Sequence, residues 1–361
     1  MTDKVVKLGV IGLGKGAYTA AEMVGEKSIK ITAICDWNPK KIEEALERHK
    51  GKFDDAQICH DIDELLKTDI DAIYIATDAV CHVPYVIKSL EAGKHVLSEI
   101  PAVNSIEEAR QLKAAVKAHP HLKYMTGENC CYWAFIQAWK KMYEEGKFGE
   151  AIYVEGEYIH SKDYREFKQE DFPPEHWRSY NPAIKYITHQ LGPILQILDD
   201  RCVSVSCMVP DIVYNPYTKR VNNNGVAIFK TAKGAVIRIF ICFDAYAGFD
   251  HNFALYGTKG TIETDKTKPL EEAHSFARFS DIPGTIEEKV EIPVTLKFPG
   301  EADDGGHGGA DKKMMLDFVK CIIEDTEPPI DVDLGIQMTI PGIIAAESSD
   351  LGGALLEIPE I

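Results

Sequence analysis

Hydrophobic positions in the first third of the chain fall into short runs separated by longer amphipathic stretches. Five short apolar runs are strand candidates: residues 5–11, 29–35, 71–77, 95–100 and 122–127. The run at 5–11 is suited to a strand buried on both faces. Apolar residues at helical spacing fill the intervals: from Ala17 onward, then over 40–49, 83–93 and 106–119. Strands that alternate with helices predict a parallel sheet covered by helices on both faces.

The pattern changes after Gly127. The remaining predicted elements are a helix over 133–149, a long strand over 151–161, a hairpin over 225–244, strands within 252–264, and helices over 311–325 and 334–349. Because these strands follow one another through short turns, their sheet should be mostly antiparallel. The sequence therefore predicts an α/β domain followed by an α+β domain, divided near residue 127.

The composition fits this division and excludes several classes of protein. A chain of 361 residues with 45% hydrophobic and 27% charged residues has enough apolar material for two cores. The net charge of −17 disfavours nucleic acid as a partner. No apolar run approaches the ~20 residues that span a membrane, and no signal-peptide pattern opens the chain. The nine scattered cysteines lack metal-ligand spacing and are typical of a reducing cytoplasm, so we expect no metal site.

A glycine motif follows the first predicted strand directly. Gly12, Gly14 and Ala17 form G-x-G-x-x-A around Leu13. Gly12 permits a tight turn, Gly14 lets the backbone approach a pyrophosphate, and Ala17 allows close helix packing. A plain structural turn is the alternative. The flanking strand and helix favour dinucleotide binding.

Asp36 ends the second predicted strand, near the ~20-residue offset of an acid that binds a ribose. Its carboxylate would repel a 2′-phosphate, which predicts NAD rather than NADP as the cofactor. Lys40 and Lys41 follow closely enough to keep NADP as the alternative.

Polar side chains end three successive strands of the predicted parallel sheet: Thr77, Asp78 and His82 after the strand at 71–77, then Glu99, then Glu128 and Asn129. Asp78 alone could be a helix cap. Ligands of such sheets bind at the carboxyl edge, where all three strand ends meet. We therefore predict a binding site there.

Tyr186 and His189 lie at the start of an apolar helix, three residues apart and on one predicted helical face. A packed tyrosine and a capping histidine are the alternative. As a pair they could accept the proton of a hydroxyl group while its carbon loses hydride, because the ordinary histidine pKa of about 6.5 lies near working pH.

Two irregular segments carry further candidates. Trp177 and Arg178 occur in an aromatic-rich connection, where arginine suits phosphate or sugar oxygens. His307 lies among four glycines just before a helix. We expect this second segment to be a substrate loop.

Together these motifs resemble the Gfo/Idh/MocA family of oxidoreductases over nearly the whole chain, including "ATDAVCH", "SEIPA", "GENCCYW", "HWR" and "THQLGP". The resemblance implies a Rossmann domain with a doubly wound parallel sheet over 1–127. It also implies a C-terminal α+β domain over 128–361 with a large, open, mostly antiparallel sheet that packs against another subunit. A homo-oligomer, dimer or tetramer, is therefore expected.

One position departs from the usual family pattern. The Glu-Lys-Pro tripeptide of the family supplies a lysine for proton transfer, and here that position is Ile100. Isoleucine neither donates nor accepts a proton. In this respect the chain resembles two branches of the family, both of which have Glu-(Val/Ile)-Pro at this position. They are the glycoside 3-dehydrogenases and the NAD-recycling glycosidases of the α-N-acetylgalactosaminidase type.

The resemblance to the glycosidases can be carried over residue by residue. It assigns substrate binding or catalysis to Glu128, Tyr158, Arg178, Tyr186 and His189. It assigns cofactor binding to Asp36, His82, Glu99, Ile100 and Asn129. Leu13, Thr77 and Trp177 complete our set of predicted cofactor residues, and His307 completes the substrate residues.

We therefore expect a cytoplasmic, NAD-dependent oxidoreductase acting on the C3 hydroxyl of a sugar or glycoside. His189 and Tyr186 transfer the proton in this prediction. An NAD-recycling glycosidase is the first alternative, and a non-catalytic NAD-binding sensor is the second.

Overall fold

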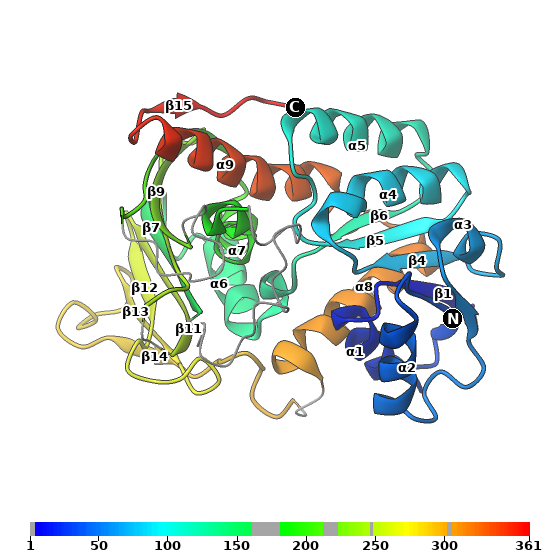
Figure 1. The fold of residues 1–361 in the computed structure, drawn as a ribbon. Helices are drawn as coiled ribbons and strands as arrows, with labels where there is room; N and C mark the ends of the chain where they lie inside the picture. Colours follow the sequence, from blue (N-terminus) through cyan, green and yellow to red (C-terminus); the bar gives the residue numbers. More distant parts are fainter. Residues whose placement is uncertain (1–3, 161–180, 212–222, 246–247, 302–304) are drawn as a thin grey trace. The chain divides into compact units, whose positions relative to one another are not determined.

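The computed structural model describes residues 4–160, 181–211, 223–245, 248–301 and 305–361. Contacts divide the chain into two compact units, drawn in Figure 1. Unit 1 comprises Met1–Asn129, Asp303–Ile336 and Ile361, and unit 2 comprises Cys130–Ala302 and Gln337–Glu360. Within the described ranges, none of the helices combines the length and the hydropathy needed to cross a bilayer.

Unit 1 contains a six-stranded parallel sheet with the order β3-β2-β1-β4-β5-β6. Its strands are β1 Val6–Ile11, β2 Ile29–Cys35, β3 Gln57–Cys59, β4 Ala72–Ile75, β5 His95–Glu99 and β6 Tyr124–Gly127. Its N-terminal helices are α1 Lys15–Glu22, α2 Pro39–Arg48, α3 Ile62–Leu65, α4 His82–Glu91 and α5 Ile106–Ala118. This strand order is that of the Rossmann fold, so the predicted doubly wound sheet is confirmed.

Helix α8, Ala310–Glu324, belongs to unit 1 although it lies far along the chain. It contacts α1, β1 and β5 and buries an apolar face that includes Met314, Met315 and Phe318. By its position in the sequence, this helix falls in the C-terminal domain predicted over 128–361. Its periodicity predicts an amphipathic helix, but local periodicity carries no information about which sheet the apolar face covers.

Unit 2 is built on a nine-stranded sheet with the order β14-β13-β12-β11-β7-β10-β9-β8-β15. Its longer strands are β7 Ala151–His160, β8 Cys202–Met208, β9 Asn224–Thr231, β10 Val236–Cys242 and β11 Phe249–Gly257. Shorter strands follow at the edges: β12 Gly260–Thr264, β13 Ser275–Phe279, β14 Val290–Ile292 and β15 Leu356–Glu357. The pair β7–β10 is parallel and every other pair is antiparallel, as the mostly antiparallel prediction requires.

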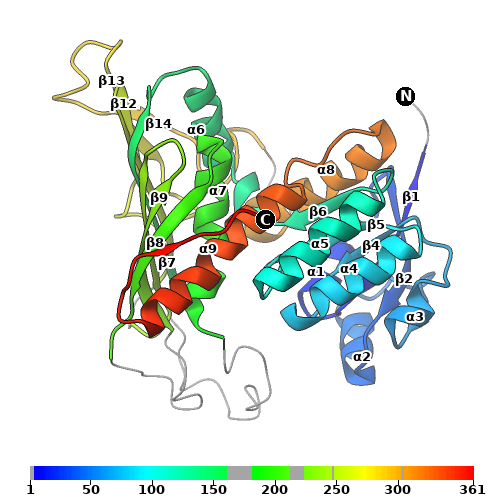
Figure 2. The same cartoon turned by 90° about the horizontal axis from the view of Figure 1, so that it is seen from above.

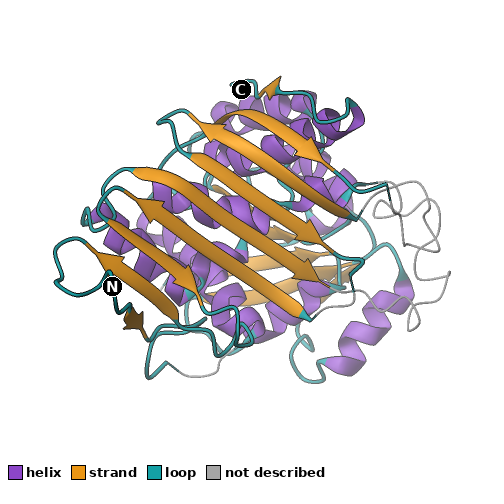
Figure 3. Cartoon of the chain, turned by 90° about the vertical axis from the view of Figure 1, so that its left-hand side faces the viewer, coloured by secondary structure: helices purple, strands orange, loops and turns teal. Residues whose placement is uncertain are grey.

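Three helices cover one face of this sheet: α6 Ala134–Glu144, α7 Thr188–Leu198 and α9 Val332–Asp350, which begins at the end of unit 1 (Figure 2). In the described part of the chain no helix lies over the other face (Figure 3). The strands alternate accordingly, since Val154 and Tyr158 of β7 are buried while Glu155 and Glu157 are partly exposed. Arg238 of β10 pairs with both glutamates, at 3.1 and 2.8 Å.

Candidate active site

The glycine loop connects β1 to α1. Gly12 has φ +91, and a Cβ there would lie 2.3 Å from the Ala76 carbonyl oxygen at the end of β4. Gly14 has φ −69, and no atom of the described residues lies within 4 Å of where its Cβ would be. Among the described residues no side chain caps α1. The loop thus offers open space beside a helix N-terminus, which is the setting a pyrophosphate requires.

Asp36, at the end of β2, holds this loop in place. Its Oδ2 accepts a hydrogen bond from the Leu13 N–H at 2.9 Å, and its Oδ1 accepts one from the Asn38 N–H at 2.9 Å. The side chain is only 7% exposed. The nearby Lys41 is paired with Glu44 at 3.0 Å. A fixed carboxylate at this position fits a cofactor with a free ribose hydroxyl better than one with a 2′-phosphate.

The end of β5 carries a buried hydrogen-bond network. The Tyr74 hydroxyl donates to Glu99 Oε1 at 2.5 Å, and the Lys15 ammonium lies 3.1 Å from the same oxygen. Burial, followed by the charge of Glu99, raises the pKa of Tyr74 well above its ordinary value. Ile100 is 6% exposed and follows Glu99 directly. Residue 100 supplies no positive charge, because it is isoleucine. The cation beside Glu99 is therefore Lys15, the first residue of α1.

His82 and Thr77 lie at the same sheet edge. His82 Nδ1 lies 2.9 Å from the Pro101 carbonyl oxygen, and Nε2 lies 3.1 Å from the Thr77 carbonyl oxygen. Both ring nitrogens thus face backbone acceptors. This geometry ties the loop that follows β4 to the segment that follows β5.

Asp311, in the first turn of α8, joins several predicted residues of unit 1. It accepts a hydrogen bond from Asn129 Nδ2 at 2.8 Å, and His307 Nδ1 lies 2.8 Å from its other oxygen. Lys15 Nζ is 3.7 Å away. His307 itself lies in η6, Gly306–Gly309, whose first N–H donates to Glu22 of α1 at 2.8 Å. Hydrogen bonds therefore join the glycine-rich segment to α1 through Glu22, and to Asn129 through Asp311.

Neither Lys15 nor Asp311 is among the site residues predicted from the sequence. Lys15 occupies an x position of the glycine motif, and Asp311 follows His307 by four residues. Both are single charged residues in sequence. Only the fold shows that the buried Asp311 carboxylate contacts Asn129, His307 and Lys15.

The charge of Asp311 should make the stability of the protein depend on pH. Burial raises the pKa of this carboxyl, but the hydrogen bond from His307 and the charge of Lys15 outweigh burial and hold the pKa below its ordinary value. Such a group stabilises the fold above the unfolded pKa of about 3.9, and this stabilisation is lost as the pH falls. We expect Asp311→Asn to lower the melting temperature most near pH 7, with the deficit shrinking between about pH 5 and pH 2.

Asp317, also on α8, provides a control of opposite sign. Burial raises its pKa, so wild type should gain stability relative to Asp317→Asn as the pH falls. Thermal unfolding of the three proteins over this pH range measures both trends. A deficit of Asp311→Asn that stays constant or grows on acidification would contradict the assignment.

The aromatic residues predicted for the substrate meet in unit 2. His189 lies in the first turn of α7, and its ring centroid is 5.2 Å from that of Tyr186 and 5.4 Å from that of Tyr158. Both contacts are edge-on, with interplanar angles of 90° and 80°. Tyr158 is 6% exposed and His189 is half-buried. The imidazole is thus held between two tyrosine rings.

The prediction that Tyr186 and His189 share one helical face needs correction. Tyr186 ends a short 3-10 helix, η5 Ala183–Tyr186, and α7 begins only at Thr188. Ile187 between them has φ −86 and ψ 1, outside the regular helix. The two rings still meet, because a turn rather than helical periodicity brings them together.

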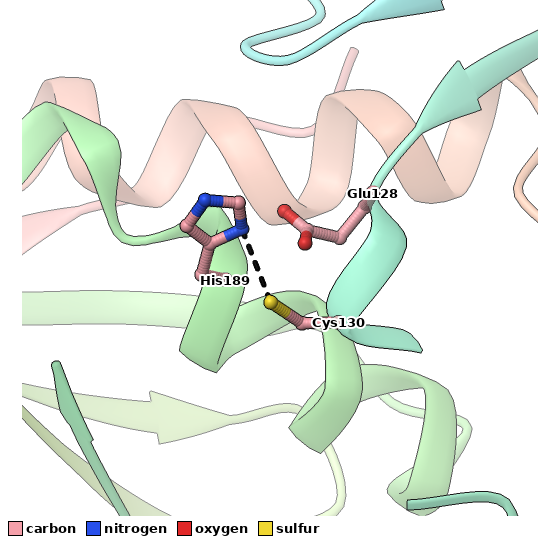
Figure 4. A group of neighbouring side chains, drawn as sticks. All are labelled: Glu128, Cys130 and His189. Atoms are coloured by element: carbon pink, nitrogen blue, oxygen red, sulfur yellow. Dashed lines mark hydrogen bonds between the residues drawn. The ribbon is translucent and has the colours of Figure 1, made fainter. Parts of the chain in front are cut away.

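Further residues complete this cluster. Cys130 Sγ lies 3.3 Å from His189 Nδ1 (Figure 4). His251 of β11 stacks on Tyr158 with centroids 4.3 Å apart, and its Nδ1 lies 2.7 Å from Gln190 Nε2. Cys130 and His251 are not among the site residues predicted from the sequence. Stacked and edge-on rings around a polar group are well suited to the apolar faces and hydroxyls of a sugar.

The predicted residues therefore fall into two groups. Unit 1 contains Gly12, Leu13, Gly14, Asp36, Thr77, His82, Glu99, Ile100, Glu128, Asn129 and His307. Unit 2 contains Tyr158, Tyr186 and His189. Glu128 is fully buried at the end of β6, two residues before Cys130, and is drawn with it in Figure 4. Trp177 and Arg178 lie outside the described residues.

Three family models match the chain. The oxidoreductase family with an NAD-binding Rossmann fold matches residues 6–127, and the GFO/IDH/MocA C-terminal domain matches 136–263. The glycosyl hydrolase 109 C-terminal domain matches 221–361. With the open glycine loop and the fixed Asp36, these matches define an NAD-binding oxidoreductase. The chain belongs to the Gfo/Idh/MocA family, as its motifs predicted, and NAD is its cofactor.

Similar proteins agree with this assignment. A glycosyl hydrolase family 109 protein of Solibacter usitatus is 28% identical over 393 residues, covering 98% of this chain and 88% of the relative. A glycosyl hydrolase family 109 protein of Bacteroides thetaiotaomicron is 27% identical, with coverages of 99% and 85%. Levoglucosan dehydrogenase with NADH and levoglucosan aligns at TM-score 0.82 and 20% identity, covering 99% of this chain and all of the other. Lactobacillus plantarum myo-inositol 2-dehydrogenase aligns at 0.79 and 21%, with the same coverages. These two structures show the shared fold.

Proposed function

We propose that this protein oxidises the C3 hydroxyl of a sugar or glycoside and holds its NAD tightly. The observation that carries the proposal is the half-buried His189 imidazole between Tyr158 and Tyr186. With Nδ1 facing Cys130, Nε2 is the nitrogen that can accept the hydroxyl proton. Tyr186 assists this transfer, and bound NAD supplies the hydride acceptor.

The remaining predicted residues orient the two ligands in this proposal. Glu128, Tyr158, Arg178 and His307 bind the sugar. The glycine loop, Asp36 and the residues Thr77, His82, Glu99, Ile100 and Asn129 bind NAD, and Trp177 is proposed as a further cofactor residue from the sequence. Keeping a reacting carbon and its hydride acceptor in register can lower a barrier by about 7–11 kcal/mol, which is why positioning residues matter for this chemistry.

A second candidate is an NAD-recycling glycosidase, supported by the glycosyl hydrolase 109 match over 221–361 and by the names of the relatives. A ketone at C3 acidifies the proton at C2. Elimination of the aglycone, addition of water and reduction of C3 by the same NADH would then give net hydrolysis without net oxidation. A non-catalytic NAD sensor is the third candidate.

Incubation with a panel of p-nitrophenyl glycosides distinguishes these functions. We expect a 3-keto glycoside and stoichiometric NADH to accumulate in the absence of a second electron acceptor, with the nitrophenyl group still attached. Release of nitrophenol without added NAD would show the glycosidase instead. If neither a 3-keto glycoside nor nitrophenol forms while NAD binds, the result would favour the non-catalytic NAD sensor. Mass spectrometry of the sugar and absorbance of the nicotinamide follow all three outcomes.

We also propose a homo-oligomer, a dimer or tetramer, formed through the helix-free face of the nine-stranded sheet. This face combines exposed apolar residues such as Ile228, which is 50% exposed, with the ion pairs of Arg238. A cytoplasmic location fits the nine cysteines, which are all thiols in the structure. Light scattering coupled to size exclusion measures the oligomer.

A further inference from the structure

Cys130 points at the candidate acid-base group, His189. It lies in η2, Asn129–Tyr132, is 2% exposed, and places Sγ 3.3 Å from His189 Nδ1. We propose that Cys130 is a positioning residue, whose thiol fixes the orientation and the tautomer of the His189 ring. This inference rests on the proposed function, because it assigns the nitrogen through which His189 exchanges a proton.

The two tyrosine rings cannot set this orientation alone. Tyr158 and Tyr186 contact the imidazole edge-on and confine its plane. Turning the ring by half a revolution about its own axis would preserve both contacts while exchanging a nitrogen for a carbon at each position. A sulfur beside Nδ1 distinguishes the two orientations, because only a ring nitrogen can share a hydrogen bond with it.

The surrounding helices hold the thiol and the imidazole in register. Gln137 of α6 donates to the carbonyl oxygen of Cys131, the next residue in the turn, and to Gln196 Oε1 of α7 at 3.2 Å. His189 lies on the same helix α7. Movement of the turn that carries Cys130 relative to α7 would break this pair of bonds. The sulfur–imidazole contact is therefore built into the packing of α6 and α7.

The arrangement gives a defined proton path. In the neutral pair the Nδ1–H donates to Sγ, and Nε2 carries the lone pair. When the alcohol is oxidised, its O–H bond breaks and the proton forms an Nε2–H bond. The C3–H electron pair leaves as hydride to NAD⁺, and the oxygen electrons form the ketone. Reduction reverses these steps, and the Nδ1–H stays on the ring throughout.

A thiol suits this role because it is a weak hydrogen-bond partner. It selects an orientation without carrying the formal charge of a carboxylate. Loss of the hydrogen-bond partner of a metal-ligating histidine typically costs about 10–100-fold in metal affinity or activity, and by analogy we expect a loss of that order in kcat here.

The test compares Cys130→Val, Cys130→Ala and Cys130→Ser with Cys202→Val, which replaces another buried thiol of unit 2 on β8. Valine and alanine remove the thiol that lies beside Nδ1, whereas serine retains a hydroxyl. We expect kcat for sugar oxidation to fall about 10–100-fold in the valine and alanine variants, with KM changed less than about twofold. Serine should restore most of kcat, and Cys202→Val should match wild type.

A spectroscopic measurement tests the pairing independently of turnover. Nitrogen-15 spectra of histidine-labelled protein, with His189 assigned through His189→Gln, report which ring nitrogen carries the proton. We expect one tautomer in wild type and Cys130→Ser, and a mixture in Cys130→Val and Cys130→Ala. An unchanged spectrum in both variants overturns the inference, as does a serine variant that folds but is as slow as valine. If wild type oxidises no sugar, the proposed function fails while these spectra still decide the pairing.

Discussion

Replacing His189 with glutamine is expected to lower kcat for sugar oxidation by about 10²–10⁴-fold, the usual contribution of a positioned general base. Glutamine keeps a polar side chain of similar length but cannot take up a proton near neutral pH. KM should change little, because the tyrosine rings and the other proposed sugar ligands remain. NAD affinity should stay within about twofold, since the glycine loop is unchanged.

The control for this experiment is His274→Gln. His274 lies on the surface of unit 2, with Nδ1 2.5 Å from Glu291, so its loss should leave kcat unaltered. Steady-state kinetics with the best sugar, together with NAD titration by fluorescence, provide the readouts. A His189→Gln enzyme that turns over at the wild-type rate would exclude this imidazole as the acid-base group.

Replacing Gly14 with alanine is expected to weaken NAD binding roughly 100-fold, or ~2.7 kcal/mol, without lowering the melting temperature of the apoprotein. The backbone at Gly14 has φ −69, which alanine adopts easily, and within the part of the chain that the structure describes no atom lies within 4 Å of the new methyl group. The methyl would instead occupy the open space beside the N-terminus of α1, where we expect the pyrophosphate to bind.

Gly12→Ala is the informative comparison. Its methyl would lie 2.3 Å from the Ala76 carbonyl oxygen, and its φ of +91 is unfavourable for alanine, so the fold itself should be destabilised. Gly248→Ala adds a methyl whose one neighbour within 4 Å among the described residues is Asp250, at 3.8 Å, and it serves as a neutral control. Calorimetric titration and thermal unfolding separate the two effects. Wild-type NAD affinity in folded Gly14→Ala would rule out this loop as the pyrophosphate site.

The sequence predicts features whose determinants are close together in the chain. The glycine loop needs only Gly12, Gly14 and a flanking strand and helix, and Asp36 is the end of the next strand. The buried strands of unit 1 are short and strongly apolar, so each is recognisable by itself. Strand β8 was not predicted, because its serines and cysteines give a weak apolar alternation.

Contacts between distant segments escape this kind of prediction. The ion pair between Lys15 and Glu99 depends on the positions of β1 and β5 in the sheet. Asp311, which lies 3.7 Å from Lys15, belongs to a helix near the other end of the chain. The bond between Cys130 and His189 likewise joins segments with no shared periodicity. The sequence indicates His189 as a candidate acid-base residue, but only the fold shows which side chains surround its ring.

The return of α8 to the first unit also has a consequence for biosynthesis. A nascent chain exposes the parallel sheet as soon as residue 127 leaves the ribosome, but α8, with Met314 and Phe318, begins only at Ala310. At translation rates of about 5–20 residues per second, roughly 10–35 s pass before the sheet receives this helix. During that interval the newborn polypeptide presents an uncovered apolar surface, which is a natural target for chaperones.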